Sequence, residues 1–263
     1  MKPDVYCNGW KAFENEVLEL NKPTIISVDN LVYNPSCVNI LCLIEPRCIS
    51  SHLYTDIDCM SVYDKIYTFD PDVLRRHEQA ELFLYGTTWL DFTSLNTEKK
   101  NQISFVTSSK NWTEGHLVRQ QIYDLLSQSN QIGEFSVFAH RSPPHYNPRN
   151  DFFASAKFHV AVENVAQDNY FTEKLVDCLM SYTVPIYRGC LNIGNFFNPD
   201  GFITFDTVQE LQHILSTITA DTYDRMQEAV RENRELAAKY AEGTPEDNLS
   251  KRLASLITAH VNG

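Results

Sequence analysis

The residues best suited to chemistry are a carboxylate and an ammonium group, Glu173 and Lys174, at the start of a predicted helix. The polar turn before them carries side chains that can bind oxygen-rich ligands: Asn164, Gln167, Asp168 and Asn169. A helix N-terminus presents unpaired N–H groups and a partial positive charge, and Lys174 adds a full charge at the same end. This combination suits a diphosphate. The alternative is that Asp168 or Asn169 only caps the helix, while Glu173 and Lys174 form a solvated pair.

A strand, a helix and a second strand must position these side chains. Residues 158–162 form an apolar run of strand length, and another strand begins at Val184-Pro185. Between them, apolar residues recur with the spacing of one buried helix face: Phe171, Leu175, Cys178 and Leu179. At about 100° of rotation per residue, Glu173 lies opposite that face, so we expect its carboxylate to point away from the core.

The order of these positions resembles the donor-binding signature of glycosyltransferase family ten, the α1,3/α1,4-fucosyltransferases. That signature has a phenylalanine, a hydrophobic run, Glu-Asn, a polar turn, Tyr-x-Thr-Glu-Lys, a helix and Val-Pro-x-x-x-Gly. This chain matches it at Phe158, Glu163-Asn164, Tyr170, Thr172-Glu173-Lys174, Val184-Pro185 and Gly189. The resemblance spans roughly residues 38–206 and is strongest over 158–189.

The resemblance implies a GT-B fold, with two facing Rossmann-like domains that contain parallel sheets, followed by C-terminal helices. It implies an inverting transferase that moves L-fucose from GDP-β-L-fucose to a hydroxyl of a glycan acceptor. GDP-fucose is then a co-substrate, and no cofactor is implied. Family members carry donor-binding residues at positions that correspond here to Asn164, Tyr170, Glu173 and Lys174. Glu173 would hold the donor ribose or the positive charge that develops on the sugar, and so also counts as catalytic.

Two alternatives remain open. The chain could be a related inverting transferase with a different nucleotide sugar as donor, because no pattern in the sequence identifies residues that bind the sugar ring. A nucleotide- or glycan-binding protein would keep the fold and lack turnover, although Glu173, Lys174 and Arg119 argue against this.

A second strand–loop–helix unit precedes the signature. Residues 103–108 read as a strand, the next residues as a loop that contains Lys110, and residues 115–128 as an amphipathic helix. Arg119 lies in the early turns of that helix, where the family has an arginine that contacts the donor phosphate. Guanidinium groups match phosphate oxygens in pairs, so Arg119 and Lys110 are predicted to bind the donor. The alternative for Arg119 is an exposed helix arginine.

A second candidate carboxylate is Glu45, which follows the most apolar strand of the first hundred residues, 38–44. Ligands of open α/β sheets lie at the carboxyl ends of strands. Partial burial there would raise the pKa of Glu45, as a general base requires. The family also has a glutamate near a proline at the end of a comparable strand. The alternative is a surface carboxylate, with Asp29, Asp56 and Asp58 as the next candidates.

The polar segment 94–102 reads as a linker between an N-terminal acceptor-side domain, 1–95, and a C-terminal GDP-sugar-binding domain with terminal helices, 103–263. Strands are expected at 24–28, 38–45, 65–69, 82–86, 103–108, 135–139, 158–162, 184–187 and 202–205. Further helices are expected at 208–217, 221–240 and 245–260. One of these helices is predicted to cross back onto the N-terminal half, as in other GT-B transferases.

Composition excludes several classes of protein. A net charge of −12 over 263 residues, without a basic cluster, argues against a nucleic-acid partner. No stretch approaches the ~20 apolar residues of a transmembrane helix, and the N-terminus lacks the apolar core of a signal peptide. The seven cysteines lack paired C-x-x-C spacing, which predicts reduced thiols and a cytoplasmic location. No metal is predicted, because Arg119, Lys174 and a helix N-terminus can neutralise a leaving diphosphate.

Overall fold

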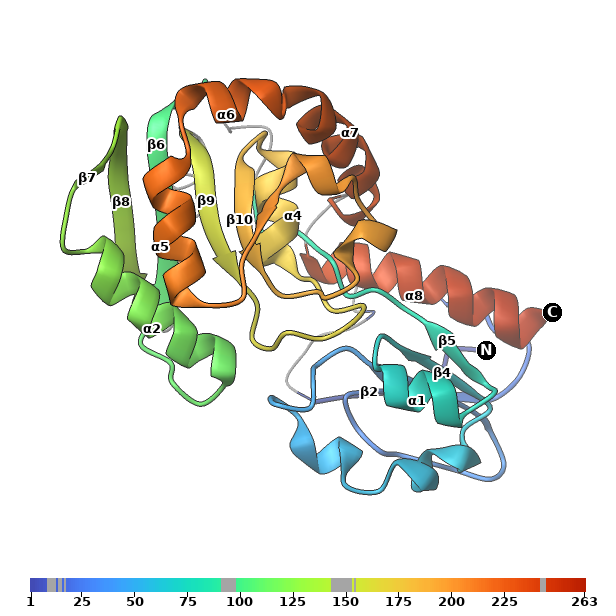
Figure 1. The fold of residues 1–263 in the computed structure, drawn as a ribbon. Helices are drawn as coiled ribbons and strands as arrows, with labels where there is room; N and C mark the ends of the chain where they lie inside the picture. The colour runs from blue at the N-terminus through green and yellow to red at the C-terminus, as the bar shows by residue number, and fades with distance from the viewer. Residues whose placement is uncertain are drawn as a thin grey trace. The chain divides into compact units, whose positions relative to one another are not determined.

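The computed structural model describes residues 1–8, 13, 16, 18–90, 98–142, 153, 155–241 and 245–263. It divides into two compact units, shown in Figure 1. The N-terminal unit comprises residues 1–87, 168–170 and 242–263, and the C-terminal unit comprises residues 88–167 and 171–241. The predicted division differs at the chain end, because residues 242–263 group with the N-terminal unit instead of closing the C-terminal domain.

The N-terminal unit is built on a five-stranded parallel sheet with strand order β1-β2-β3-β4-β5. Its strands are β1 (Asp4–Cys7), β2 (Thr24–Val28), β3 (Val38–Leu43), β4 (Lys65–Thr68) and β5 (Ala80–Leu82). Its helical segments are η1 (Ser51–Tyr54), η2 (Ile57–Val62), α1 (Pro71–Arg76) and α8 (Pro245–Asn262). The central strand β3 is buried from its second residue onward, as expected of an apolar strand with neighbours on both sides.

Helix α8 explains the division at the chain end. Leu249, Leu253, Ile257 and Val261 recur at the spacing of one helix face and share a core with residues of β2 and β3. Arg252 from the same helix donates to the backbone oxygens of Leu84, Tyr85 and Gly86. The expectation that a C-terminal helix crosses back onto the N-terminal half is confirmed for α8.

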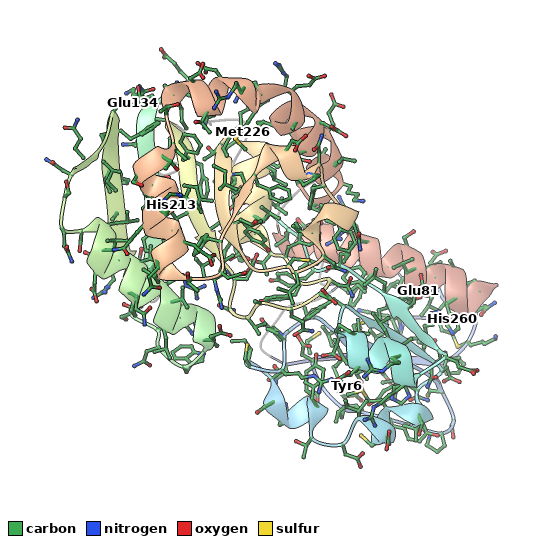
Figure 2. The ribbon with its side chains drawn as sticks, in the orientation of Figure 1. Tyr6, Glu81, Glu134, His213, Met226 and His260 are labelled. Carbon is green, nitrogen blue, oxygen red and sulfur yellow. The ribbon has the colours of Figure 1, made fainter. Side chains whose placement is uncertain are left out.

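Two details of the N-terminal sheet differ from the sequence prediction. The edge strand β1 was not predicted, because it alternates between exposed and half-buried residues and lacks an apolar run. The strand expected at 82–86 lies instead at Ala80–Leu82. There Glu81 pairs with Lys65 of β4, the Nζ to Oε2 distance being 2.7 Å; Figure 2 labels Glu81.

The C-terminal unit contains a six-stranded sheet with strand order β11-β10-β9-β6-β8-β7, in which only the β7–β8 pair is antiparallel. Its strands are β6 (Lys100–Ser108), β7 (Gln131–Ile132), β8 (Phe135–Ser142), β9 (Ala156–Val162), β10 (Val184–Arg188) and β11 (Ile203–Thr204). Its α-helices are α2 (Glu114–Leu126), α4 (Glu173–Met180), α5 (Val208–Thr217), α6 (Ala220–Arg225) and α7 (Gln227–Ala237). Short 3-10 turns are η3 (Ile193–Asn195), η4 (Pro199–Gly201) and η5 (Ala238–Tyr240).

The helix predicted at 221–240 is interrupted. It consists of α6, α7 and η5, and Met226, labelled in Figure 2, separates the first two. A capping box between Thr219 and Thr222 starts α6. The predicted linker also ends earlier than expected, because β6 begins at Lys100; residues 94–97 of that linker lie outside the described residues.

Helices of the C-terminal unit lie on both faces of its sheet, and α2 and α4 begin at its carboxyl edge (Figure 1). Among the described residues, no helix combines the length and the apolar character needed to cross a membrane.

Candidate functional site

The carboxyl edge of the C-terminal sheet is fixed by the residues that follow β9. The amide of Glu163 donates to the Arg188 oxygen at 2.9 Å, which extends the pairing of β9 with β10 by one residue. The amide of Gly115, in the first turn of α2, donates to the Asn164 oxygen at 3.0 Å. A Cβ atom on Gly115 would lie 1.8 Å from the Glu163 oxygen, so only glycine permits this approach. The start of α2 and the end of β9 therefore form one rigid corner.

The Glu163 side chain is fully buried at this corner. Its Oε1 accepts from the amide of Thr172 at 2.8 Å, and its Oε2 accepts from the Thr172 hydroxyl at 2.7 Å. A Cβ atom on Gly189 would lie 2.4 Å from Glu163 Cγ and 2.4 Å from Tyr187 Oη, so this glycine leaves room for the carboxylate. Burial raises the pKa of Glu163, although Lys174 acts in the opposite direction.

Thr172 is the N-cap of α4, since its hydroxyl accepts from the Lys174 amide at 3.3 Å. The alternative in which Asp168 or Asn169 caps this helix is therefore wrong. The Lys174 ammonium donates to Glu173 Oε1 at 2.8 Å and to the Thr172 hydroxyl at 3.2 Å. The first turn of α4 thus holds an ammonium group between acidic and hydroxyl oxygens.

The helix periodicity predicts that Glu173 points away from the core, and this prediction is wrong. The Glu173 side chain is only 10% exposed, whereas that of Lys174 is 26% exposed. The prediction assumed one buried face, but α4 packs against α7 as well as against β9 and β10. Every residue of α4 except Lys174 is consequently buried. The alternative of a solvated Glu173–Lys174 pair is wrong for the same reason.

Arg119 is buried, with 6% of its surface exposed. Its guanidinium donates to the backbone oxygen of Val162 and, at 2.9 Å, to Asn164 Oδ1. The alternative of an exposed helix arginine is therefore wrong. Arg119 and Asn164, both predicted to bind the donor, lie at the same corner as Glu163, and the contact with a donor phosphate stays a prediction.

Lys110 lies in the loop between β6 and α2, with its Nζ 5.3 Å from the ring centroid of Trp112. Trp112 is 61% exposed, and its ring centroid lies 4.9 Å from that of His116 in a T-shaped arrangement. His116 completes a capping box with Thr113 at the start of α2. Burial lowers the pKa of His116 to about 4, and the nearby cations Arg119, Lys110 and Lys174 add to this effect. The imidazole is thus neutral near pH 7, and Lys110 lies beside the predicted phosphate-binding groups.

Tyr170 belongs to the N-terminal unit together with Asp168 and Asn169. It is 2% exposed, and its ring centroid lies 5.0 Å from that of Phe69. Asn169 adopts a left-handed backbone with φ of 62° and donates from Nδ2 to the Phe69 oxygen at 3.3 Å. Tyr170 is thus a core residue of that unit, and the predicted donor contact stays a prediction.

In the N-terminal unit, Glu45 follows β3 and is half-buried. Its backbone oxygen accepts from the Tyr54 hydroxyl at 2.9 Å, and its amide donates to Asp29 Oδ1 at 3.2 Å. Asp29 is 3% exposed, has φ of 46°, and also accepts from the Ile44 amide at 2.9 Å. Burial raises the pKa of Asp29 to about 6. Asp29 thus has a raised pKa of the kind that a general base requires, and the raised pKa expected of Glu45 stays a prediction.

The other two acidic candidates lie at the start of η2. Asp58 pairs with Arg76 at 3.2 Å and is 80% exposed, and Asp56 precedes η2 without a side-chain cap bond. Over the described residues, no group of three or more His, Cys, Asp or Glu side chains is placed to hold a metal ion.

Sequence reasoning gave no role to Glu163 and only a reserve role to Asp29. A signal was available for both: each carboxylate follows a buried parallel strand directly, Glu163 after β9 and Asp29 after β2. The sequence does not show the hydrogen-bond donor of either carboxylate, because Thr172 approaches Glu163 and Ile44 approaches Asp29 only in the folded chain.

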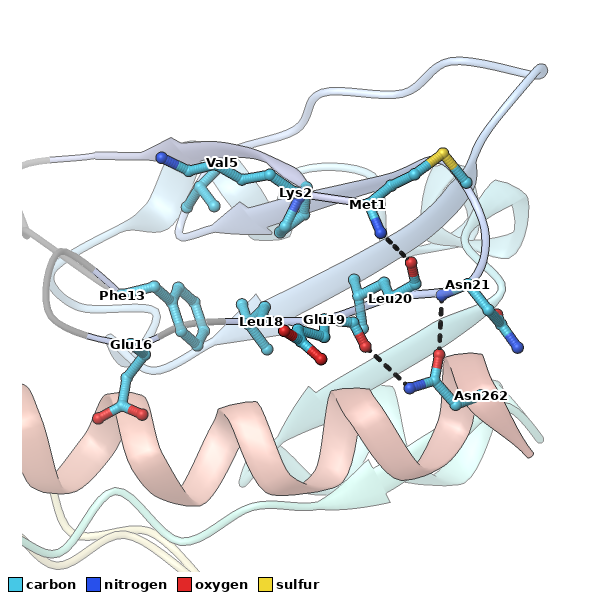
Figure 3. Close-up of a pocket in the computed structure, with 11 residues that line it drawn as sticks. Met1, Lys2, Val5, Phe13, Glu16, Leu18, Glu19, Leu20, Asn21 and Asn262 are labelled. Carbon is cyan, nitrogen blue, oxygen red and sulfur yellow. Dashed lines mark hydrogen bonds between the residues drawn. The ribbon is translucent and has the colours of Figure 1, made fainter.

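A pocket of about 750 Å³ lies elsewhere in the N-terminal unit, between the start of the chain and the end of α8 (Figure 3). Asn262 closes one end by accepting from the Asn21 amide and donating to the Glu19 oxygen, both at 2.9 Å. None of the predicted site residues lines this pocket.

Solved structures share the fold of the chain. A crystal structure of an α1,3-fucosyltransferase has a TM-score of 0.57 at 16% identity, over 99% of this chain and 90% of that one. The same kind of enzyme with GDP gives a TM-score of 0.55. A trehalose-6-phosphate synthase gives 0.54 at 10% identity, over 90% and 74% of the two chains. The fold is therefore of the GT-B type, with two α/β domains, as predicted.

Sequence comparisons identify relatives over shorter segments. The α-(1,3)-fucosyltransferase FucT of Helicobacter pylori is 34% identical over 108 residues, which cover 40% of this chain and 21% of that protein. An α-(1,4)-fucosyltransferase of Arabidopsis thaliana is 45% identical over 58 residues, or 21% and 14% of the two chains. The matches thus span about a fifth or less of the length of these curated relatives.

The family model described as glycosyltransferase family 10 (fucosyltransferase), C-terminal, matches residues 96–229. The match contains the corner formed by Arg119, Glu163 and Asn164 and the start of α4 with Thr172, Glu173 and Lys174. The chain therefore belongs to glycosyltransferase family 10, the fucosyltransferase family.

Proposed function

We propose that the chain is an inverting fucosyltransferase that moves L-fucose from GDP-β-L-fucose to a hydroxyl of a glycan acceptor. The observation that carries the proposal is the first turn of α4, where Lys174 stands beside Glu173 and the helix N-terminus inside the family match. An α1,3-fucosyltransferase of similar fold was solved with GDP, which supports GDP as the nucleotide.

The C-terminal unit supplies the groups for the leaving diphosphate. The Lys174 ammonium and the N–H groups at the start of α4 offer positive potential to phosphate oxygens. Arg119 adds a second cation at the same sheet edge and fixes the side chain of Asn164. These groups stabilise the negative charge that develops as the bond between fucose C1 and the diphosphate oxygen breaks. We therefore propose that transfer requires no metal ion.

The N-terminal unit supplies the base. Glu45 removes the proton from the acceptor hydroxyl, and that oxygen bonds to fucose C1 on the face opposite the departing GDP, so a β-linked donor gives an α-linked product. Asp29 is the second candidate, because its raised pKa of about 6 suits proton transfer near neutral pH. Its Oδ1, however, is already engaged by the backbone amides of Ile44 and Glu45.

The direct test is an assay of GDP release from GDP-fucose with a panel of acceptors that end in galactose or N-acetylglucosamine. We expect release to depend on one class of acceptor, and NMR of the product to show an α-linked fucose. Acceptor-dependent release from another GDP-sugar instead would identify a related transferase. Tight GDP binding without any product would identify a binding protein.

A further inference from the structure

The Glu163 carboxylate has no part in the steps above, yet it lies beneath the residues that would hold the donor. It is fully buried, and both of its oxygens accept from Thr172, the residue that caps α4. Gly189 leaves room for this side chain, since a Cβ at position 189 would lie 2.4 Å from Glu163 Cγ, and Gly115 lets α2 approach the Glu163 backbone oxygen. The fold thus makes room for a buried acid at this place.

Glu163 also shares the charge of Lys174. The Lys174 ammonium lies 3.8 Å from Glu163 Oε2 and 2.8 Å from Glu173 Oε1, and it donates to the same Thr172 hydroxyl that donates to Glu163. With all three groups ionised, the cluster carries two negative charges and one positive charge. Arg119 adds a second positive charge at the same sheet edge, so the two carboxylates are balanced before a ligand binds. A diphosphate that binds to Lys174 adds negative charge beside both carboxylates, which favours the uptake of a proton by one of them.

Glu163 is the carboxylate of the cluster that is best placed to take up that proton. It is completely buried, and burial is the main reason why its pKa is raised. The titratable and charged groups around it are Lys174, Glu173 and Cys178 on α4, Tyr187 on β10 and Arg119 on α2. Burial raises the pKa of Cys178 and of Tyr187 well above their usual ranges, so both stay neutral near pH 7.

We propose that Glu163 is a positioning residue of the donor site: it orients Thr172 and Lys174 when ionised, and it takes up a proton from solvent when a nucleoside diphosphate binds to Lys174. The proposal rests on the proposed function. Its sign follows from linkage: added negative charge near Glu163 strengthens proton binding, so GDP binds more tightly at lower pH and more weakly as the pH rises.

The test is calorimetric titration of the full chain with GDP, in buffers of different ionisation enthalpy, at several pH values between about 5 and 8. The dependence of the heat on the buffer gives the number of protons taken up. The matched variant is Glu163→Gln, which keeps the size of the side chain and can still accept from the Thr172 amide. GDP has a titrating phosphate of its own, and this contributes equally to both proteins.

We expect the wild type to take up about one proton more per GDP than Glu163→Gln at the pH of the largest difference. In the wild type, GDP affinity should fall with rising pH by more than the titration of the GDP phosphate explains. This additional decrease should be absent in Glu163→Gln. Equal proton uptake in two folded proteins would overturn the proposal. Absence of GDP binding by the wild type at every pH would instead contradict the proposed function.

A second variant keeps the test decisive if Glu163→Gln does not fold. Thr172→Val retains the shape of Thr172 and removes the hydroxyl that donates to Glu163 Oε2. Loss of that bond favours the protonated form, so the pH range of proton uptake should move upward by about one pH unit. An unchanged range would overturn the proposal, because a merely structural role of Glu163 does not couple its proton to GDP.

Discussion

The carboxyl edges of the two sheets both carry a buried carboxylate directly after a parallel strand, but the two carboxylates have different partners. In the C-terminal unit, Glu163 accepts from Thr172 and lies 3.8 Å from the Lys174 ammonium. In the N-terminal unit, Asp29 accepts from the backbone amides of Ile44 and Glu45. The first edge has an ammonium group beside its buried carboxylate, whereas the second has two neighbouring acidic residues, Asp29 and Glu45; we call them the mixed-charge edge and the acidic edge. The same topology thus produces one edge suited to binding an anion and one suited to accepting a proton.

The largest effect is expected at the acidic edge. Glu45→Gln removes the proposed base and should lower kcat by about 10²-fold or more, while GDP affinity stays near that of the wild type. Initial rates with GDP-fucose and a productive acceptor, together with GDP titrations, measure both quantities. Full activity in this variant would show that Glu45 is not the base, and Asp29 would be the next residue to test.

Substitutions at the mixed-charge edge should weaken GDP binding. Lys174→Ala removes a charged donor and should weaken GDP binding by about 10- to 150-fold, the scale of a hydrogen bond to a charged group. Glu173→Gln should impair both GDP binding and turnover, since Glu173 holds Lys174 in place. Lys100→Ala is a matched control, because this exposed lysine lies at the opposite end of β6. If the Lys174 and Lys100 variants bind GDP with equal affinity, the diphosphate does not bind at this edge.

Asp29 at the acidic edge should also make the unfolding free energy depend on pH. The folded state raises the pKa of Asp29 from 3.8 to about 6, so it binds the proton more strongly than the unfolded chain does between these values. The contribution of Asp29 to the unfolding free energy therefore falls as the pH rises through this range, by roughly 2–3 kcal/mol. Asp29→Asn should match the wild type near pH 4 and exceed its stability by up to this amount above about pH 7.

Urea denaturation of both proteins across this range measures the difference. The wild type alone is a poor reporter, because all its other carboxylates titrate as well. A stability difference between the two proteins that does not change with pH would show that Asp29 ionises normally.

The smallest expected effect is none. If Lys174 and the start of α4 neutralise the diphosphate, transferase activity should be the same with and without EDTA. A loss of turnover on chelation, restored by Mn²⁺ or Mg²⁺, would show that the mixed-charge edge is insufficient by itself.

The sequence predicted the sheet cores and the signature more accurately than the fine structure of the site. Residues 24–28 and 208–217 form a strand and a helix with the predicted bounds, because each has a clear apolar period and clear end signals. Helix 221–240 was predicted as one segment, since the break at Met226 has neither proline nor glycine to mark it. Periodicity thus locates elements but not breaks that arise from packing.

Burial of charged residues was the property least accessible from the sequence. The apolar face of the helix predicts a solvent-exposed Glu173, but its side chain is only 10% exposed in the structure. Similarly, Asp29 is a buried acid with a raised pKa, and its carboxylate accepts from the amides of Ile44 and Glu45. Both results depend on contacts between segments that are separate in the chain, which a local pattern does not contain.

Gly115 has a consequence for attempts to make this protein more stable. Replacing a helical glycine by alanine is a standard stabilising substitution, with a usual gain of up to about 1 kcal/mol. In the first turn of α2, however, the added methyl group would lie 1.8 Å from the Glu163 oxygen. A saturation-mutagenesis screen should therefore find position 115 as intolerant as a catalytic position, although glycine offers no reactive group. Thermostabilisation programmes that choose sites by helix propensity alone should leave it unchanged.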